Sequence, residues 1–245
     1  MITNTYRIAN KNIRISSCFN QVHILCREYL FDGTPDLFVT VDYNDINLER
    51  QKSDSTKSET NSKYFSDSYL ETLAVYRKIA EYMINWDTLL FHGSVIAVDG
   101  NSYLFAANSG TGKSTHTALW RKHFGSRALM VNDDKPLLKI SQNKVFACGT
   151  PWNGKHNLGN NIILPLKSIC FLHRSSENHI ESISRKQALP LLLKYAYKSS
   201  DKEKTAKTLR LIDNILTNVN VYSLGCNMDI SAVTTAYNKI TEDLK

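Results

Sequence analysis

The feature that most constrains this chain is the segment 107–114, which reads Ala-Asn-Ser-Gly-Thr-Gly-Lys-Ser. The two glycines inside it let successive backbone N–H groups curl around an anion without a clash from Cβ. Lys113 can reach the outer phosphates of a nucleotide, and the Ser114 hydroxyl can enter a Mg²⁺ shell. The pattern therefore predicts a phosphate-binding loop followed by a helix over 114–124, whose N-terminal dipole faces the phosphates.

One position of this loop departs from the strict pattern, which has a glycine where this chain has Ala107. A single methyl group is tolerated there if φ stays negative. The alternative is a glycine-rich turn between a strand and a helix that holds no ligand. We favour nucleotide binding because the motif lies between a predicted strand and a predicted helix. The candidate nucleotide-binding residues are Asn108, Ser109, Gly110, Thr111, Gly112, Lys113, Ser114 and Thr115.

An acidic motif follows the loop at the end of a predicted strand. Residues 127–131 read as a short buried strand, and Asn132-Asp133-Asp134 comes directly after it. Two carboxylates in this position suit metal-assisted phosphoryl transfer, because one can hold Mg²⁺ while the other accepts a proton from an attacking hydroxyl. An acidic turn or a helix cap is the alternative.

The strand that enters the loop is predicted to be one arm of a β-hairpin. Apolar residues at 94–98 and 103–107 flank Asp99-Gly100, a dipeptide typical of tight hairpin turns. An antiparallel arm that feeds the loop differs from common nucleotide-binding α/β domains, in which a parallel strand follows a helix crossover. Pairing across this turn places His92 beside the loop, where a site role and a structural role are both open.

A second hairpin is predicted over 136–148, and a loop with glycine and proline follows it. From residue 149 to residue 155 this loop reads Gly-Thr-Pro-Trp-Asn-Gly-Lys. Exposed side chains at Trp152 and Lys155 would suit contact with a substrate or a phosphate. A rigid turn anchored by Trp152 is the alternative.

The rest of the chain predicts an α/β (α+β) fold, with a mixed sheet flanked by helices. Further strands are predicted at 6–15, 21–26, 37–43, 165–173 and 220–224. Amphipathic helices are predicted at 70–84, 184–197, 202–216 and 229–244.

Two local signals suggest how the chain is divided. Residues 50–64 are polar and serine-rich and predict a flexible loop, while Ser68 and Glu71 fit a helix capping box. We therefore expect a β-rich part at 1–64 and a phosphate-loop domain at 65–245, or one continuous domain.

Composition limits the compartment and the partners. The net charge of +7 suits phosphate ligands and acidic peptides, and no arginine-rich block or zinc-finger spacing indicates nucleic acid. Five scattered cysteines without a C-x-x-C pair fit reduced thiols. No apolar run approaches the roughly 20 residues of a membrane span, and the N-terminus lacks an apolar signal core. We expect a cytoplasmic protein without nucleic-acid or membrane partners.

The order of these motifs resembles the catalytic domain of HPr serine kinase/phosphorylase: His-Gly, a hairpin, Ser-Gly-Thr-Gly-Lys-Ser, then a strand ending in Asp-Asp. It is more distantly similar to the nucleotide site of ATP-dependent phosphoenolpyruvate carboxykinase. The Gly-Thr-Pro-Trp-x-Gly-Lys stretch and the Leu-Pro-Leu-Lys strand after it look like a compact branch of HPr-kinase-like proteins. Some members of that branch accompany peptide-modification gene sets. The likeness covers roughly residues 88–175.

This resemblance implies a kinase that uses ATP, or another nucleoside triphosphate, with Mg²⁺ to phosphorylate a hydroxyl. The expected acceptor is a serine of a peptide or small protein, such as a modified-peptide precursor, or a small molecule. The family pattern assigns Asp133 as the base, Asp134 with Ser114 as Mg²⁺ ligands, and Lys113 and His92 to the transferred phosphate. A homo-oligomer is also implied, because kinases of the family form rings. The Arg-Gly-Leu-Gly core that recognises HPr is absent, so HPr is not the expected acceptor.

A nucleotide-binding regulatory or chaperone-like module without transferase activity is the second hypothesis. ATP binding without turnover would favour it. A GTP switch or a motor is disfavoured, because the chain has neither an Asn-Lys-x-Asp motif nor a Leu-Ser-Gly-Gly-Gln signature.

Overall fold

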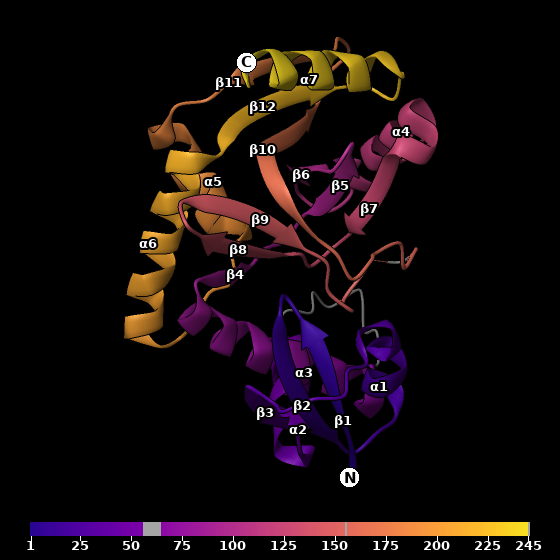
Figure 1. The fold of residues 1–245 in the computed structure, drawn as a ribbon, viewed down its shortest axis with the longest axis vertical. Coiled ribbons are helices and arrows are strands. Elements are labelled where there is room, and N and C mark those ends of the chain that lie inside the picture. The colour runs from indigo at the N-terminus through magenta and orange to yellow at the C-terminus, as the bar shows by residue number, and fades with distance from the viewer. Residues whose placement is uncertain (56–64, 155, 245) are drawn as a thin grey trace. The chain divides into compact units, whose positions relative to one another are not determined.

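The computed structural model describes residues 1–55, 65–154 and 156–244 (Figure 1). The chain forms two compact units, unit 1 (Met1–Tyr82) and unit 2 (Met83–Lys245). This division comes later than the boundary expected between residues 64 and 65. In the described part of the chain, no helix combines the length and apolar character that a membrane crossing requires.

Unit 1 is built on a three-stranded sheet with the order β1-β2-β3. Its strands are β1 (Ile2–Ile8), β2 (Lys11–Ser17) and β3 (Leu37–Thr40). Its helical segments are α1 (Gln21–Leu25), the 3-10 turn η1 (Arg27–Tyr29), α2 (Tyr43–Ser55) and α3 (Asp67–Met83). Strands β1 and β2 are antiparallel, whereas β3 pairs with β2 in parallel.

Two secondary-structure predictions for unit 1 were wrong. The segment predicted as a strand at 21–26 is mostly helix α1, because Val22 and Cys26 are fully buried at helical spacing. The predicted loop at 50–64 is helical up to Ser55, where α2 ends, and its remaining residues, 56–64, lie outside the described residues.

The predicted capping box of Ser68 and Glu71 was also wrong. Helix α3 begins at Asp67, two residues earlier than a cap at Ser68 predicts, and the Ser66 hydroxyl accepts a hydrogen bond from the Tyr69 N–H at 3.3 Å. The fully buried Glu71 carboxylate instead accepts the backbone N–H groups of Cys18 at 2.6 Å and Phe19 at 3.0 Å. Glu71 therefore satisfies the backbone just beyond β2, and α3 is tied to unit 1 through it.

Unit 2 is built on a larger mixed sheet, with the strand order β4-β8-β9-β10-β6-β5-β7; β12 pairs with β10 and β11. Its strands are β4 (Thr88–Leu90), β5 (Ser94–Val98), β6 (Asn101–Ala106), β7 (Ala128–Asn132), β8 (Leu137–Ser141), β9 (Lys144–Cys148), β10 (Ile163–Arg174), β11 (His179–Ser182) and β12 (Asn220–Cys226). Its helical segments are η2 (Ile84–Trp86), α4 (Lys113–Phe124), η3 (Gly125–Arg127), α5 (Arg185–Tyr195), α6 (Lys202–Asn218) and α7 (Ser231–Glu242).

The long strand β10 joins the two parts of this sheet (Figure 1). Its first residues, 163–165, pair antiparallel with β9. From Leu166 onward it pairs in parallel with β6, with a register shift before Ser168, and its last residues pair in parallel with β12. The predicted mixed α+β fold is therefore present in unit 2.

Both predicted hairpins are confirmed. Strands β5 and β6 pair antiparallel up to Val98 and Asn101, and the two turn residues between them have φ values of 49° at Asp99 and 78° at Gly100. Two positive φ angles define a type I′ turn, which matches the twist of the strands. Strands β8 and β9 are joined in the same way, with positive φ at Gln142 and Asn143.

Helices cover both faces of this sheet, so its central strands are buried on both sides. Along β5, Val95 packs in a core cluster with residues of α5 and α6, and Ile96 packs in a second cluster with residues of α4 and α7. This alternation explains why every residue of β5 is buried. The arrangement fixes α4 and α5 on opposite faces of the strands that lead to the segment 107–112.

Candidate functional site

The segment 107–112, here called the β6–α4 loop, has the backbone that its glycines permit. Gly110 has a φ of 77° and Gly112 a φ of 121°, values that a residue with a Cβ rarely adopts. A Cβ at either position would meet no atom within 4 Å, so the space beside each glycine is open. Helix α4 begins at Lys113, as the spacing predicted to within one residue. Its unpaired N–H groups and its dipole favour an anion at this end.

The Lys113 ammonium lies at this loop and within electrostatic reach of Asp134. Asp134 belongs to the turn after β7, residues 132–135, here called the acidic turn. Lys113 donates a hydrogen bond to the Ala107 carbonyl at 2.8 Å. Burial lowers the pKa of Lys113, the charge of Asp134 raises it, and the charge of Lys135 lowers it. An ammonium in this setting has given up part of its hydration, which makes an incoming phosphate a favourable partner.

Three side chains from distant parts of unit 2 hold the rest of the loop. Arg174, at the end of β10, donates to the Gly110 carbonyl at 2.7 Å. Lys194 and Tyr195, at the end of α5, donate to the Asn108 side-chain oxygen at 2.7 Å and 3.3 Å. The loop conformation is therefore supported from both the sheet and α5.

The acidic turn is built around Asn132, which is fully buried. Its Oδ1 accepts the backbone N–H groups of Asp134 at 2.9 Å and Lys135 at 2.6 Å. Its Nδ2 donates to the carbonyl and the hydroxyl of Thr150, at 3.1 Å and 3.0 Å, and to the Trp152 carbonyl at 3.4 Å. One amide side chain thus fixes both the turn and the loop that follows β9.

Asp133 is nearly buried and is held by backbone groups. The Gly154 N–H donates to its Oδ1 at 2.5 Å, and the Ser94 hydroxyl donates to its carbonyl oxygen at 3.0 Å. Burial is the main cause that raises the pKa of Asp133, and the Gly154 hydrogen bond opposes it. A carboxylate with a raised pKa is a better proton acceptor than an exposed one.

Asp134, Lys135 and His92 form a contact group beside Asp133. The Lys135 ammonium donates to Asp134 Oδ2 at 3.0 Å and to His92 Nδ1 at 2.8 Å. Burial, followed by the charge of Lys135, lowers the pKa of His92 to about 4. His92 is therefore neutral at pH 7, so the 3.5 Å contact between its Nδ1 and Asp134 Oδ1 is not an ion pair. Because an ammonium has no lone pair, Nδ1 is the acceptor and Nε2 carries the proton.

Of four further residues predicted for the site, two are exposed, one is buried and one lies outside the described residues. Ser114 and Thr115 are exposed on the first turn of α4, and no described residue bonds to the Ser114 hydroxyl. No set of three or more His, Cys, Asp or Glu side chains in the described residues can hold a metal by itself. The prediction of an exposed Trp152 was wrong, because only 7% of this residue is exposed. Lys155 lies outside the described residues.

Five residues of this site were not predicted from the sequence: Asn132, Lys135, Arg174, Lys194 and Tyr195. The first two adjoin the acidic pair, so an amide before it and a cation after it were the signals available. The other three lie far from the loop in sequence, and no local pattern marks them.

A cavity of about 460 Å³ lies beside the β6–α4 loop. Its lining includes Gly110, Thr115, His116, Arg174 and Asn227. The buried His116 accepts the Trp120 indole N–H at its Nε2 at 2.9 Å, and its Nδ1 has no hydrogen-bond partner in the described structure.

Stability of unit 2 is expected to fall as the pH is lowered from about 6.5 to about 4. Burial lowers the pKa of His116 from its ordinary value of 6.5 to about 4, so in this interval only the unfolded chain takes up the proton. The loss of stability begins when the pH falls below about 6.5, and it is complete below the pKa of His116 in the folded protein, about 4. Replacing His116 by Gln, which can still accept from Trp120, is expected to flatten this pH dependence.

Urea unfolding followed by tryptophan fluorescence measures this effect. The three tryptophans, Trp86, Trp120 and Trp152, all belong to unit 2, so the signal reports on that unit alone. Equal pH slopes for the native and H116Q proteins would contradict the prediction.

Comparison with known proteins gives a family match and likenesses to solved structures. The solved structure of the Hpr(Ser) kinase/phosphatase from Coxiella burnetii is similar over 64% of this chain and 99% of that chain, with 13% identity and a TM-score of 0.36. No curated protein matches the chain. The family model of the SynChlorMet cassette protein ScmC matches residues 66–229, which is more than half of the sequence. The chain therefore belongs to the ScmC family of SynChlorMet cassette proteins.

Proposed function

We propose that this protein is a Mg²⁺-dependent phosphotransferase. It would move the terminal phosphoryl group of ATP, or of another nucleoside triphosphate, to a hydroxyl of a peptide, small protein or small molecule. The observation that carries this proposal is the position of Lys113, which opens α4 and interacts electrostatically with the acidic turn. The same ammonium can thus meet a phosphate while it interacts electrostatically with Asp134, the neighbour of the assigned base.

The β6–α4 loop fits a chain of phosphates. Its glycines hold φ values that a residue with a Cβ rarely adopts, and the space beside them is open. The loop N–H groups, the α4 N-terminus and Lys113 would hold the phosphates, and the adjoining cavity has room for a nucleoside. Arg174 lines the cavity and bonds to the loop, so it would restrict the direction in which the nucleoside extends from the phosphates.

The residues present also fit Mg²⁺ that arrives with the nucleotide. Mg²⁺ commonly takes one or two protein oxygens and completes its shell with phosphate and water. Ser114 and Asp134 would supply those oxygens. When bound, the ion would neutralise charge on the phosphoryl oxygens.

Asp133 is the residue we assign as the base. Gly154 occupies its Oδ1, so Oδ2 is the oxygen that would take the proton of the attacking hydroxyl. Its raised pKa favours this transfer near neutral pH. His92, with its proton on Nε2, would donate to a phosphate oxygen, while Lys135 adds positive charge at the same place.

Replacing Lys113 by Ala is expected to weaken Mg²⁺-ATP binding about 50-fold, because a charge-assisted contact to phosphate is lost. Isothermal titration calorimetry measures the affinity. Lys122→Ala is the matched control, since Lys122 is exposed on the same helix. Equal affinities for the K113A and native proteins would remove Lys113 from the phosphate site.

A further inference from the structure

The C-terminal end of α5 lies directly beside the segment that carries His92. The His92 N–H donates to the Tyr195 carbonyl at 2.8 Å, and Phe91 and Ala196 form an antiparallel bridge next to this bond. Residues 195 and 196 are thus paired with residues 91 and 92 as in a short stretch of sheet. This pairing fixes the backbone of Tyr195 relative to that of His92, although the two residues are far apart in sequence.

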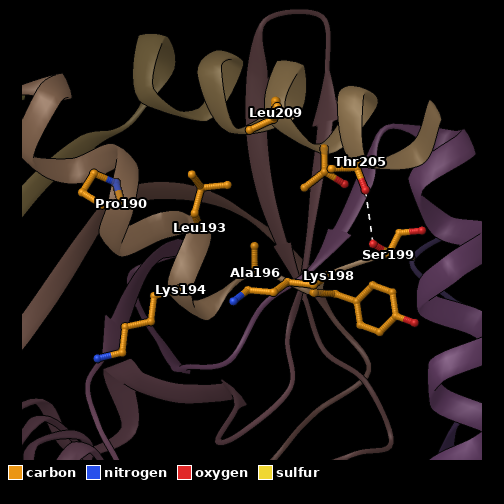
Figure 2. A pocket seen from close by; sticks show the side chains of 10 residues that line it. Pro190, Leu193, Lys194, Ala196, Lys198, Ser199, Thr205 and Leu209 are labelled. Carbon is orange, nitrogen blue, oxygen red and sulfur yellow. Dashed lines mark hydrogen bonds between the residues drawn. The ribbon is translucent and has the colours of Figure 1, made fainter. Parts of the chain in front are cut away.

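The segment after α5 is also attached to α6. Figure 2 shows the Thr205 hydroxyl of α6 bonded to the Ser199 carbonyl, a hydrogen bond of 3.2 Å. The same view shows Leu193 pointing toward α6 and Lys194 pointing away from it. Lys194 instead donates to Asn108 of the β6–α4 loop. The end of α5 is therefore held by α6 and in turn holds the loop.

The Tyr195 side chain contacts both the β6–α4 loop and His92. Its hydroxyl donates to Asn108 Oδ1 at 3.3 Å. Its ring stacks on the His92 ring, with centroids 6.4 Å apart and an angle of 20° between the planes, and on the Phe171 ring, at 5.8 Å and 25°. Phe171 is buried in β10 and supports the Tyr195 ring from the sheet. One side chain thus connects the phosphate loop with His92.

The orientation of His92 is set by its neighbours, while one of its ring atoms is left for a ligand. Tyr195 holds its backbone N–H and stacks on its ring, and the Lys135 ammonium donates to its Nδ1 at 2.8 Å. The His92 side chain is nevertheless 40% exposed. Its Nε2 is open to solvent and has no partner among the described residues. A group held in this way loses little conformational entropy when it binds a ligand.

We propose that Tyr195 is a positioning residue, which keeps the Nε2–H of His92 available to an oxygen of the transferred phosphate. The inference rests on the proposed phosphotransferase function, because only that function gives His92 a phosphate to contact. Tyr195 itself would touch neither the nucleotide nor the acceptor. It would act through His92, while its hydroxyl shares the support of Asn108 with Lys194.

Two substitutions separate the ring of Tyr195 from its hydroxyl. Tyr195→Leu removes both and is expected to lower kcat for transfer of labelled phosphate from ATP to serine about 20-fold, because His92 loses its fixed orientation. The KM for Mg²⁺-ATP should change less than about threefold, since Lys194 still bonds to Asn108. Tyr195→Phe, which keeps the stacked ring, should retain at least about a third of the native kcat. Equal kcat values for the Y195L and native proteins would overturn the proposal.

A double substitution tests whether Tyr195 acts through His92. In a protein that already carries His92→Ala, Y195L should lower kcat less than about twofold further. Tyr237→Leu is the matched control, because Tyr237 is a half-buried tyrosine of α7 that also packs against aromatic rings. Its effect should be the same with and without His92. A further loss of about 20-fold from Y195L in the H92A protein would contradict the proposed route.

Nuclear magnetic resonance of ¹⁵N-labelled histidine tests the positioning without nucleotide or transfer. Burial is the largest cause that lowers the pKa of His92 to about 4, so removal of the Tyr195 ring in Y195L should raise this pKa toward 6.5. Y195F should leave it unchanged, and the H92A protein identifies the signal. An unchanged His92 signal in Y195L would overturn the inference. A shifted signal in a protein whose native form transfers no phosphate would instead refute the phosphotransferase proposal alone.

Discussion

Replacing Asp133 by Asn is expected to lower phosphoryl transfer about 1,000-fold while Mg²⁺-ATP affinity stays within about threefold. Asparagine has the same shape, and its side-chain oxygen can still accept the Gly154 N–H that now bonds to Asp133 Oδ1. The substitution removes the negative charge and the ability to take a proton, while the contact with Gly154 can remain. Loss of transfer without loss of binding would therefore separate the base from the phosphate site.

The measurement is transfer of labelled phosphate from ATP to free serine and to a panel of serine peptides, together with calorimetric ATP affinity. Asp213→Asn is the matched control, because Asp213 is an exposed carboxylate that pairs with Arg185 on the surface of unit 2. Full transfer by D133N would show that Asp133 is not the base. Tight ATP binding by the native protein without transfer to any acceptor would favour a regulatory module instead.

Replacing Asn132 by Ala is expected to destabilise unit 2 by about 3 kcal/mol and to impair transfer as well. The Asn132 amide bonds to two backbone N–H groups and to three oxygens of the loop after β9. Alanine would leave these buried groups without partners, which costs more than the hydrogen bonds alone contribute. The acidic turn would also lose the contact that sets the positions of Asp133 and Asp134.

Tryptophan fluorescence during urea unfolding measures this change, since it reports on unit 2. Asn238→Ala is the control, because Asn238 is exposed on α7 and its loss should change stability by less than about 0.5 kcal/mol. An unfolding midpoint for N132A equal to that of the native protein would show that the turn does not depend on Asn132.

The features that the sequence predicted well are those with local signals. Asp99-Gly100 specifies its turn within four residues, and the spacing of Gly110, Gly112 and Lys113 specifies the loop and the start of α4. The acidic pair follows β7 directly, so its place at the strand end could be read from a short apolar run.

The features that the sequence did not predict depend on contacts between distant segments. Nothing near Glu71 shows that its carboxylate meets the backbone of Cys18 and Phe19, so the sequence alone predicts a helix cap there. Trp152 follows a proline in a polar stretch, and only the folded chain shows that its side chain is buried. The sequence of α1 predicts a strand because β-branched residues in a short segment favour strands, and tertiary packing overrides this preference.

The supports of the β6–α4 loop also imply an order in which it forms as the chain folds. The hairpin, the loop and α4 are neighbours in sequence, so their contacts require little loop-closure entropy. The bonds from Arg174 to Gly110 and from Lys194 to Asn108 span 64 and 86 residues and must form later. A chain that has emerged from the ribosome only as far as β7 thus holds every residue of the hairpin, the loop and α4. It acquires the side chains that hold the loop in place only when β10 and α5 have been synthesised.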